Sequence, residues 1–210
     1  MFYHSHSGAQ IRTKVGYWRF VHMERLVPHL RDHFDPLQDR LLCFAKYGVQ
    51  TEGWFKGEML LLLDKLVERG IVTTFDREVR RETVLVDLQV CLNQLHWLEL
   101  KHWLIGKQKG TTYGASFYFR DRSSVGIIRD VSKLLACPAG DPRWLLILAS
   151  ANPGVEAWRR GVEGFNEKFK PIRVTSHTDP GEFPTSYFLG LLSVDSLPDV
   201  ESKPPAFPAD

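Results

Sequence analysis

The chain of 210 residues has a mass of 24.2 kDa and a formal net charge of +2 at pH 7, which neither demands nor excludes a polyanionic partner. Hydrophobic residues (43%) and charged residues (25%) stand in the proportions of a globular domain, which excludes a largely disordered chain. Three cysteines without CxxC spacing argue against a disulfide framework or a zinc ribbon and indicate a reducing compartment. No apolar run reaches about 18 residues, so we expect a cytoplasmic protein without a membrane span.

A polar arm and three helices are expected in the first third of the chain. After the arm, apolar residues recur at roughly helical spacing over residues 21–34, and a second helix is expected over residues 37–47. The sequence "TEGWFKGEMLLLLDKLVERG" at residues 51–70 begins with a threonine suited to an N-cap and ends with a glycine suited to terminate a helix. Its block Met59–Leu63 is apolar nearly all round, so this helix should be covered on several sides.

Strands rich in β-branched and aromatic residues follow, over residues 71–81, 84–90 and 96–104. A helix capped by Ser123 or Ser124 comes next, with apolar residues at helical spacing. "WLLILAS" is a continuous apolar run of the kind found in a buried strand. The last expected elements are a helix over residues 155–169 and strands over residues 172–176 and 187–194.

The element order of helix, three strands, helix and strand predicts an α/β domain with a layered, mixed sheet. We expect an N-terminal arm with helices at residues 1–48 and the α/β domain at residues 49–195. The proline-rich tail at residues 196–210 is short of aliphatic residues and is expected to be disordered.

The stretch "VDLQVCLNQLHWLELKHWL" at residues 86–104 places charged residues within apolar runs. Asn93 suits a tight turn, and a three-residue loop centred on it would set Asp87 opposite Glu99. The two-residue period of a strand then puts Lys101 on the same face as both carboxylates. The other face is aliphatic and collects Val84, Val86, Leu88, Val90, Leu98 and Leu100.

Two carboxylates on facing strands, with Cβ atoms roughly 5 Å apart, repel each other unless one is protonated or a cation lies between them. Mg²⁺ meets that need, because it binds one or two carboxylates and fills its shell with water and phosphate oxygens. A lysine beside it would orient or deprotonate an attacking water, or neutralise a phosphate. The alternative is a solvated hairpin face with ordinary ion pairs. Leu85, Trp97 and Trp103 share that face and should partly cover it, which favours a site.

These residues resemble the PD-(D/E)xK nuclease superfamily, which has a restriction-endonuclease-like core. In that superfamily an aspartate on the second strand precedes (Asp/Glu)-x-Lys on the third, and many members add a glutamate on the first core helix. The matching residues are Asp87, Glu99-Leu100-Lys101 in "LELKH", and Glu58 in "WFKGEML". The resemblance covers roughly residues 50–150, and a valine precedes Asp87 where the motif has proline.

The resemblance implies a nuclease that depends on Mg²⁺ or Mn²⁺ and hydrolyses phosphodiester bonds, with DNA preferred because the superfamily mostly cuts DNA. It also implies that Asp87, Glu99 and the backbone carbonyl of Leu100 bind the metal, that Glu58 supports it, and that Lys101 assists the attacking water.

Several other polar residues near the hairpin are candidates for function. Those that could follow a phosphate backbone are Lys107, Lys109, Arg120 and Arg122, with an ordinary charged loop as the alternative. Asp130 and Lys133, one helical turn apart, are interpreted as a surface ion pair. His96 and His102 fall on the aliphatic face and are interpreted as residues of a sheet edge or an interface.

Two other functions remain open from the sequence. The first is a catalytically inactive module of the same fold that binds a nucleic acid or a protein, and the second is a metal-dependent phosphoesterase acting on small molecules. DNA is the expected partner, whether duplex or single-stranded, and a homodimer is left open.

Overall fold

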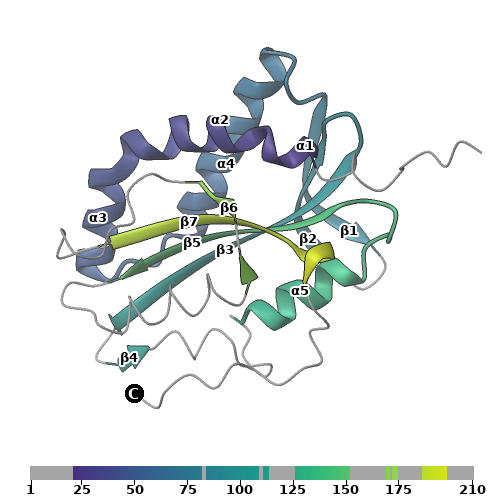
Figure 1. The fold of residues 1–210 in the computed structure, drawn as a ribbon. Helices are drawn as coiled ribbons and strands as arrows, with labels where there is room; N and C mark the ends of the chain where they lie inside the picture. Colours follow the sequence, from purple (N-terminus) through teal and green to yellow (C-terminus); the bar gives the residue numbers. More distant parts are fainter. Residues whose placement is uncertain are drawn as a thin grey trace, which may run out of the picture.

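The structure, a computed structural model, describes residues 21–81, 84–108, 111–113, 126–151, 169–170, 172–174 and 186–197. It is an α/β fold in layers, with helices on both faces of one mixed sheet (Figure 1). The helices are α1 (Val21–Glu24), α2 (Leu26–Phe34), α3 (Gln38–Tyr47), α4 (Glu52–Glu68) and α5 (Ile127–Leu135). The predicted α/β class and the layered, mixed sheet are therefore confirmed.

The sheet has the strand order β1-β2-β3-β5-β7-β6, and β4 pairs with β3 beside this path. The strands are β1 (Thr74–Arg81), β2 (Val84–Cys91), β3 (Leu95–Gln108), β4 (Thr111–Tyr113), β5 (Arg143–Ala151), β6 (Ile172–Arg173) and β7 (Ser186–Ser193). β3 and β5 are parallel, and the other neighbouring pairs are antiparallel. A parallel pair requires a crossover, and α5 lies in the chain between these two strands.

Two hydrophobic cores lie on the opposite faces of the sheet. The α4-side core packs α1–α4 against the sheet and includes Leu30, Phe34, Phe55, Met59, Leu63, Leu146 and Leu148. The α5-side core includes Trp97, Trp103, Ile127, Val131, Leu134, Leu145 and Ile147. Successive residues of β5 alternate between the two cores and are almost fully buried, which confirms that "WLLILAS" is a buried strand. Burial of each leucine or isoleucine among them contributes roughly 1.5–3 kcal/mol.

The helices that precede residue 49 are part of this core. Phe34 at the end of α2 contacts the rings of Trp54 and Phe55 on α4, edge-on or tilted. Met23 and Leu41, from α1 and α3, are also buried in the α4-side core. α1–α3 therefore complete one face of the sheet.

The predicted register of the β2–β3 hairpin is confirmed where the two strands pair. Leu88 pairs with Leu98 and Val90 with His96, as a three-residue loop centred on Asn93 requires. The pairing of β2 with β3 ends at Leu88, so the predicted position of Asp87 directly opposite Glu99 in the ladder is wrong.

The sheet is distorted at Asp87. On the side of β1, the residue opposite Asp87 is Glu78, which has a φ of 52° and is missing from an otherwise regular set of pairs. The strand also changes face here, because Leu88 packs in the α4-side core and Val86 in the α5-side core. The expectation that Val86 and Leu88 share one aliphatic face is therefore wrong. The distortion opens the sheet at the residue that carries the first carboxylate.

Other expectations concern residues that the structure does not describe. The arm at residues 1–20, residues 155–168 of the expected helix and the tail from residue 198 lie outside the described residues. The expected helix cap at Ser123 or Ser124 is wrong, because α5 begins at Ile127 with Gly126 in extended conformation as its N-cap. Within the described ranges, no helix combines the length and apolar character needed to cross a membrane.

Candidate active site

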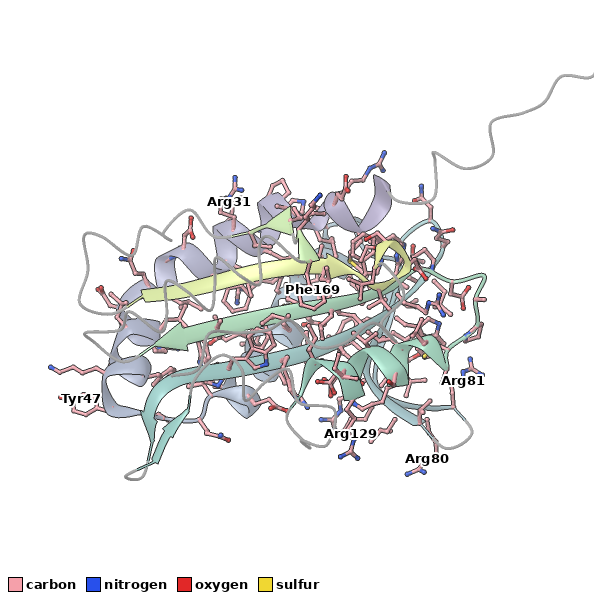
Figure 2. The ribbon with its side chains drawn as sticks, turned by 60° about the horizontal axis from the view of Figure 1, so that its bottom comes forward. Arg31, Tyr47, Arg80, Arg81, Arg129 and Phe169 are labelled. Carbon is pink, nitrogen blue, oxygen red and sulfur yellow. The ribbon has the colours of Figure 1, made fainter. Side chains whose placement is uncertain are left out.

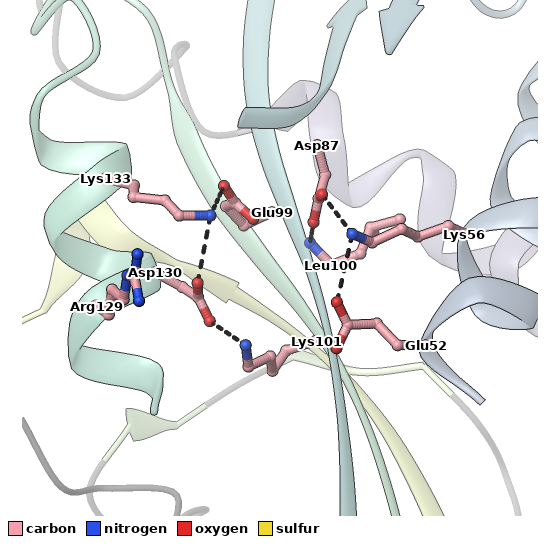
Figure 3. Close-up of a pocket in the computed structure, with 9 residues that line it drawn as sticks. All are labelled: Glu52, Lys56, Asp87, Glu99, Leu100, Lys101, Arg129, Asp130 and Lys133. Carbon is pink, nitrogen blue, oxygen red and sulfur yellow. Dashed lines mark hydrogen bonds and ion pairs between the residues drawn. The ribbon is translucent and has the colours of Figure 1, made fainter. Parts of the chain in front are cut away.

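A pocket of about 240 Å³ lies at the distortion between β2 and β3. Its lining residues come from α4, β2, β3 and α5: Glu52, Lys56, Asp87, Glu99, Leu100, Lys101, Arg129, Asp130 and Lys133 (Figure 3). α4 and α5 cover opposite faces of the sheet, so polar side chains from both faces meet where the strands part. The pocket contains the predicted Asp87, Glu99, Leu100 and Lys101.

Asp87 is held at the point where β2 leaves β3. Its Oδ2 accepts a hydrogen bond of 3.0 Å from the backbone N–H of Leu100, and its Oδ1 lies 2.7 Å from Nζ of Lys56. Burial by itself would raise the pKa of Asp87. Hydrogen bonds with Glu99, Lys56 and the Leu100 N–H favour the carboxylate more strongly, and the pKa is lowered. Asp87 is therefore ionised at neutral pH.

Glu99 is only 2% exposed and lies beside Asp87. Its pKa is raised to about 8 by burial, by the charge of Asp87 and by a hydrogen bond with Asp87. The ammonium of Lys133, 2.6 Å from Oε1, acts in the opposite direction. The two neighbouring carboxyl groups thus share one proton at neutral pH, which is the outcome predicted for facing acids without a cation between them.

Lys101 reaches across to α5. Its Nζ is 2.9 Å from Oδ2 of Asp130, and both side chains are less than a tenth exposed. Lys133, one turn further along α5, lies between Asp130 at 3.5 Å and Glu99 at 2.6 Å. Lys133 is therefore the lysine that pairs with Glu99. Lys101, two residues from Glu99 on the same strand, pairs with Asp130.

The residues of α5 correct the interpretation of Asp130 and Lys133 as a surface pair. Asp130 is 4% exposed and faces the sheet. The sequence holds a signal for this, because Ile127, Asp130, Val131 and Leu134 form one stripe at helical spacing. An aspartate inside an apolar stripe is buried with it and needs a partner.

α4 contributes a different acid from the one expected. Glu58 does not line the pocket, since its carboxylate is 2.9 Å from Nε2 of His33 and 3.5 Å from Nη1 of Arg40. Lys56 lines the pocket, and a residue two positions further along a helix points to nearly the opposite side. The acid that α4 brings to the pocket is Glu52, whose Oε1 lies 3.3 Å from Lys56.

His96 and His102 are core residues rather than residues of a sheet edge. Nδ1 of His96 accepts a hydrogen bond of 3.2 Å from the indole N–H of Trp144. Nδ1 of His102 lies 3.4 Å from the backbone nitrogen of Thr51, which donates to it at the start of α4. Burial lowers the pKa of His102 to about 4, so this ring is neutral at physiological pH.

The expected phosphate-backbone contacts cannot be placed at the pocket. Lys109, Arg120 and Arg122 lie outside the described residues, as does the side chain of Lys107 at the end of β3. Arg129, by contrast, lines the pocket, is exposed on α5 and projects from the helix toward solvent (Figure 2).

A divalent metal is compatible with the pocket only if the protein supplies few ligands. Among the residues that the structure describes, no group of three His, Cys, Asp or Glu side chains is arranged to hold a metal ion. Asp87 and Glu99 supply two adjacent carboxylates that repel each other when both are ionised. Two carboxylates with water and substrate oxygens suit Mg²⁺, and Mn²⁺ accepts the same oxygen ligands, whereas a structural zinc site needs four protein ligands.

No family model, curated protein or solved structure matches the chain. The function of the pocket is therefore inferred from its own geometry and from the sequence pattern that led to it.

Proposed function

We propose that this protein is a divalent-metal-dependent nuclease of the PD-(D/E)xK superfamily that hydrolyses phosphodiester bonds in DNA. The observation that carries the proposal is that Asp87, Glu99 and Lys101 line one pocket, at the point where β2 and β3 stop pairing. Two acids forced to share a proton, with lysines on either side, have the charge distribution that a bound cation and a phosphate would complete.

The element order gives further support. α4, β1, β2, β3, α5 and β5 follow one another along the chain as helix, three strands, helix and strand, the order of the restriction-endonuclease-like core. The aspartate is on the second of these strands and the Glu-x-Lys on the third. This agreement is independent of the charged residues, because element order is set by the apolar pattern.

Each residue has a role in the proposed reaction. Asp87, Glu99 and the Leu100 carbonyl would hold Mg²⁺ or Mn²⁺, which polarises a phosphoryl oxygen and lowers the pKa of a bound water. Lys101 orients the attacking water. Glu52 replaces Glu58 as the acid from the first core helix, where it pairs with Lys56.

The cationic side chains suit a polyanionic substrate. Lys56, Arg129 and Lys133 line the pocket and together offset the negative charge that a phosphodiester brings. Arg129 is the most accessible of them to a nucleic-acid backbone, because it is exposed at the outside of α5 (Figure 2).

Cleavage of supercoiled plasmid and single-stranded DNA in Mg²⁺, Mn²⁺ or EDTA tests the proposal. We expect metal-dependent cleavage that falls by roughly a hundredfold or more in Asp87→Asn and Lys101→Met. Asp76→Asn and Lys65→Met make the same changes at exposed positions of β1 and α4 and should cleave like the wild type. Equal loss in these controls, or cleavage that persists in EDTA, would contradict the assignment.

One observation favours a catalytically inactive binding module as the second candidate. Both central carboxylates already have ammonium partners, Lys56 for Asp87 and Lys133 for Glu99. If these lysines are never displaced, the pocket stays closed to a metal. Failure of folded wild-type protein to cleave either DNA substrate or a phosphomonoester would make this module the better account.

A further inference from the structure

Seven ionisable side chains form a continuous line through the pocket. In spatial order they are Lys101, Asp130, Lys133, Glu99, Asp87, Lys56 and Glu52. Positive and negative groups alternate except between Glu99 and Asp87, where a proton is shared. The Glu-x-Lys lysine thus stands at one end of this line, and its contact with the line is Asp130 on α5.

We propose that Asp130 is a positioning residue of the pocket, which holds the Lys101 ammonium where the proposed hydrolysis needs it. This inference rests on the proposed nuclease function, and it adds α5 to the working parts of the site.

Burial makes the contact obligatory. The Lys101 and Asp130 side chains are 8% and 6% exposed, and their charged atoms are 2.9 Å apart. A buried ammonium without an anion beside it is strongly unfavourable, so the contact with Asp130 holds the Lys101 side chain in this place. Glu99 does not fill that role, since its carboxylate is occupied by Lys133 and Asp87.

The position of Asp130 is itself fixed by packing. Ile127, Val131 and Leu134 anchor the same stripe of α5 in the α5-side core and are at most 1% exposed. Lys133 adds a second contact, 3.5 Å from Oδ1 of Asp130. A carboxylate held on a packed helix restricts Lys101, whose four-carbon side chain is otherwise flexible.

A positioning role explains the pair better than stability does. A buried ion pair contributes little net free energy compared with apolar residues of similar size. Both groups line the pocket instead of lying within the hydrophobic core. Loss of the pair is therefore expected to change the position of the Lys101 ammonium more than it changes the stability of the fold.

The first test measures the reactivity of individual lysines in the full-length, metal-free protein. Brief acetylation followed by peptide mass spectrometry reports how freely each amine reacts. We expect acetylation of Lys101 to rise roughly tenfold in Asp130→Asn, because the amine is no longer held in its buried ion pair with α5 and becomes accessible to the reagent. Asp64→Asn, the same change at an exposed position of α4, should leave it unchanged. Unchanged reactivity of Lys101 in Asp130→Asn would overturn the inference.

The second test uses cleavage kinetics. Asp130→Asn should lower kcat by roughly a hundredfold with little change in KM, and adding it to Lys101→Met should cause no further loss. Asp130→Glu keeps the charge and moves it outward by one methylene, so it should retain the protection of Lys101 but lower kcat. Independent, additive losses, or wild-type kcat in Asp130→Glu and Asp130→Asn, would overturn the inference. A wild type without cleavage would instead refute the proposed function, while the acetylation result would still report on Asp130.

Discussion

Glu99 is the residue at which the chemistry of the pocket depends most directly on pH. Its side chain is buried between a carboxylate on β2 and an ammonium on α5. With a pKa of about 8, it is mainly protonated at pH 7, whereas Asp87 beside it is ionised. The pair therefore carries about one negative charge in the absence of a cation.

This shift predicts how stability depends on pH. The pKa of Glu99 is about 8 in the folded protein against a reference of 4.5, so the folded state holds the proton more tightly. Its stabilising contribution is fully present below pH 4.5 and is lost as the pH rises through 8. The amide in Glu99→Gln does not titrate between pH 5 and 8. The free energy of unfolding of this variant should therefore fall less over that range than that of the wild type, by an amount on the order of a few kcal/mol.

Urea denaturation at a series of pH values measures this effect. Glu68→Gln, an exposed position near the end of α4, is the matched control and should keep the wild-type pH dependence. The same pH dependence in Glu99→Gln and in the wild type would show that Glu99 does not titrate as described.

At the scale of elements, the site depends on how α5 docks on the sheet. Leu134 is fully buried in the α5-side core, whereas the next residue, Leu135, is 47% exposed. Leu134→Ala should lower the free energy of unfolding by about 2–5 kcal/mol, because it leaves a cavity beneath the helix. Leu135→Ala should change it by no more than about 0.5 kcal/mol. Thermal or chemical denaturation of the two variants checks the prediction, and equal losses would contradict this docking.

The hairpin is the element that the sequence predicts best. Its turn at Asn93, its register and the shared face of Glu99 and Lys101 all follow from local rules about turns and strand period. The local rules miss the distortion at Asp87. It involves Glu78 in the neighbouring strand and a hydrogen bond from the Leu100 N–H to the Asp87 carboxylate. The distortion arises where β2 meets β1, and the sequence of the hairpin alone does not contain that contact.

The helical contributions were harder to predict, for a different reason in each helix. The apolar block of α4 extends nearly all round it, so the sequence does not fix which side faces the pocket. The predicted Glu58 therefore faces away from the pocket, and Glu52 lines it. In α5 the stripe that buries Asp130 is clear, but its partner Lys101 is far away in the sequence. The local sequence shows which side of α5 is buried, but it does not show that Asp130 contacts Lys101.

At the scale of the whole molecule, the strand order explains why one pocket collects groups from both faces. α4 packs on one face of the sheet and α5 on the other. At the opening between β2 and β3, polar side chains from both helices line the same pocket (Figure 3). A continuous sheet would keep Lys56 and Lys133 apart. The fold thus places one lysine from each face of the sheet beside the two carboxylates.

Calorimetric titration of the protein with Mn²⁺ or Mg²⁺ at pH 7, in two buffers of different ionisation enthalpy, tests the central claim most directly. A cation between Asp87 and Glu99 must displace the proton that they share, so binding should release about one proton per ion. Glu99→Gln has no such proton and should bind more weakly, with almost no release. Binding without proton release in the wild type, or no binding at millimolar ion, would contradict a cation site at this pair, and absent binding would favour the inactive module.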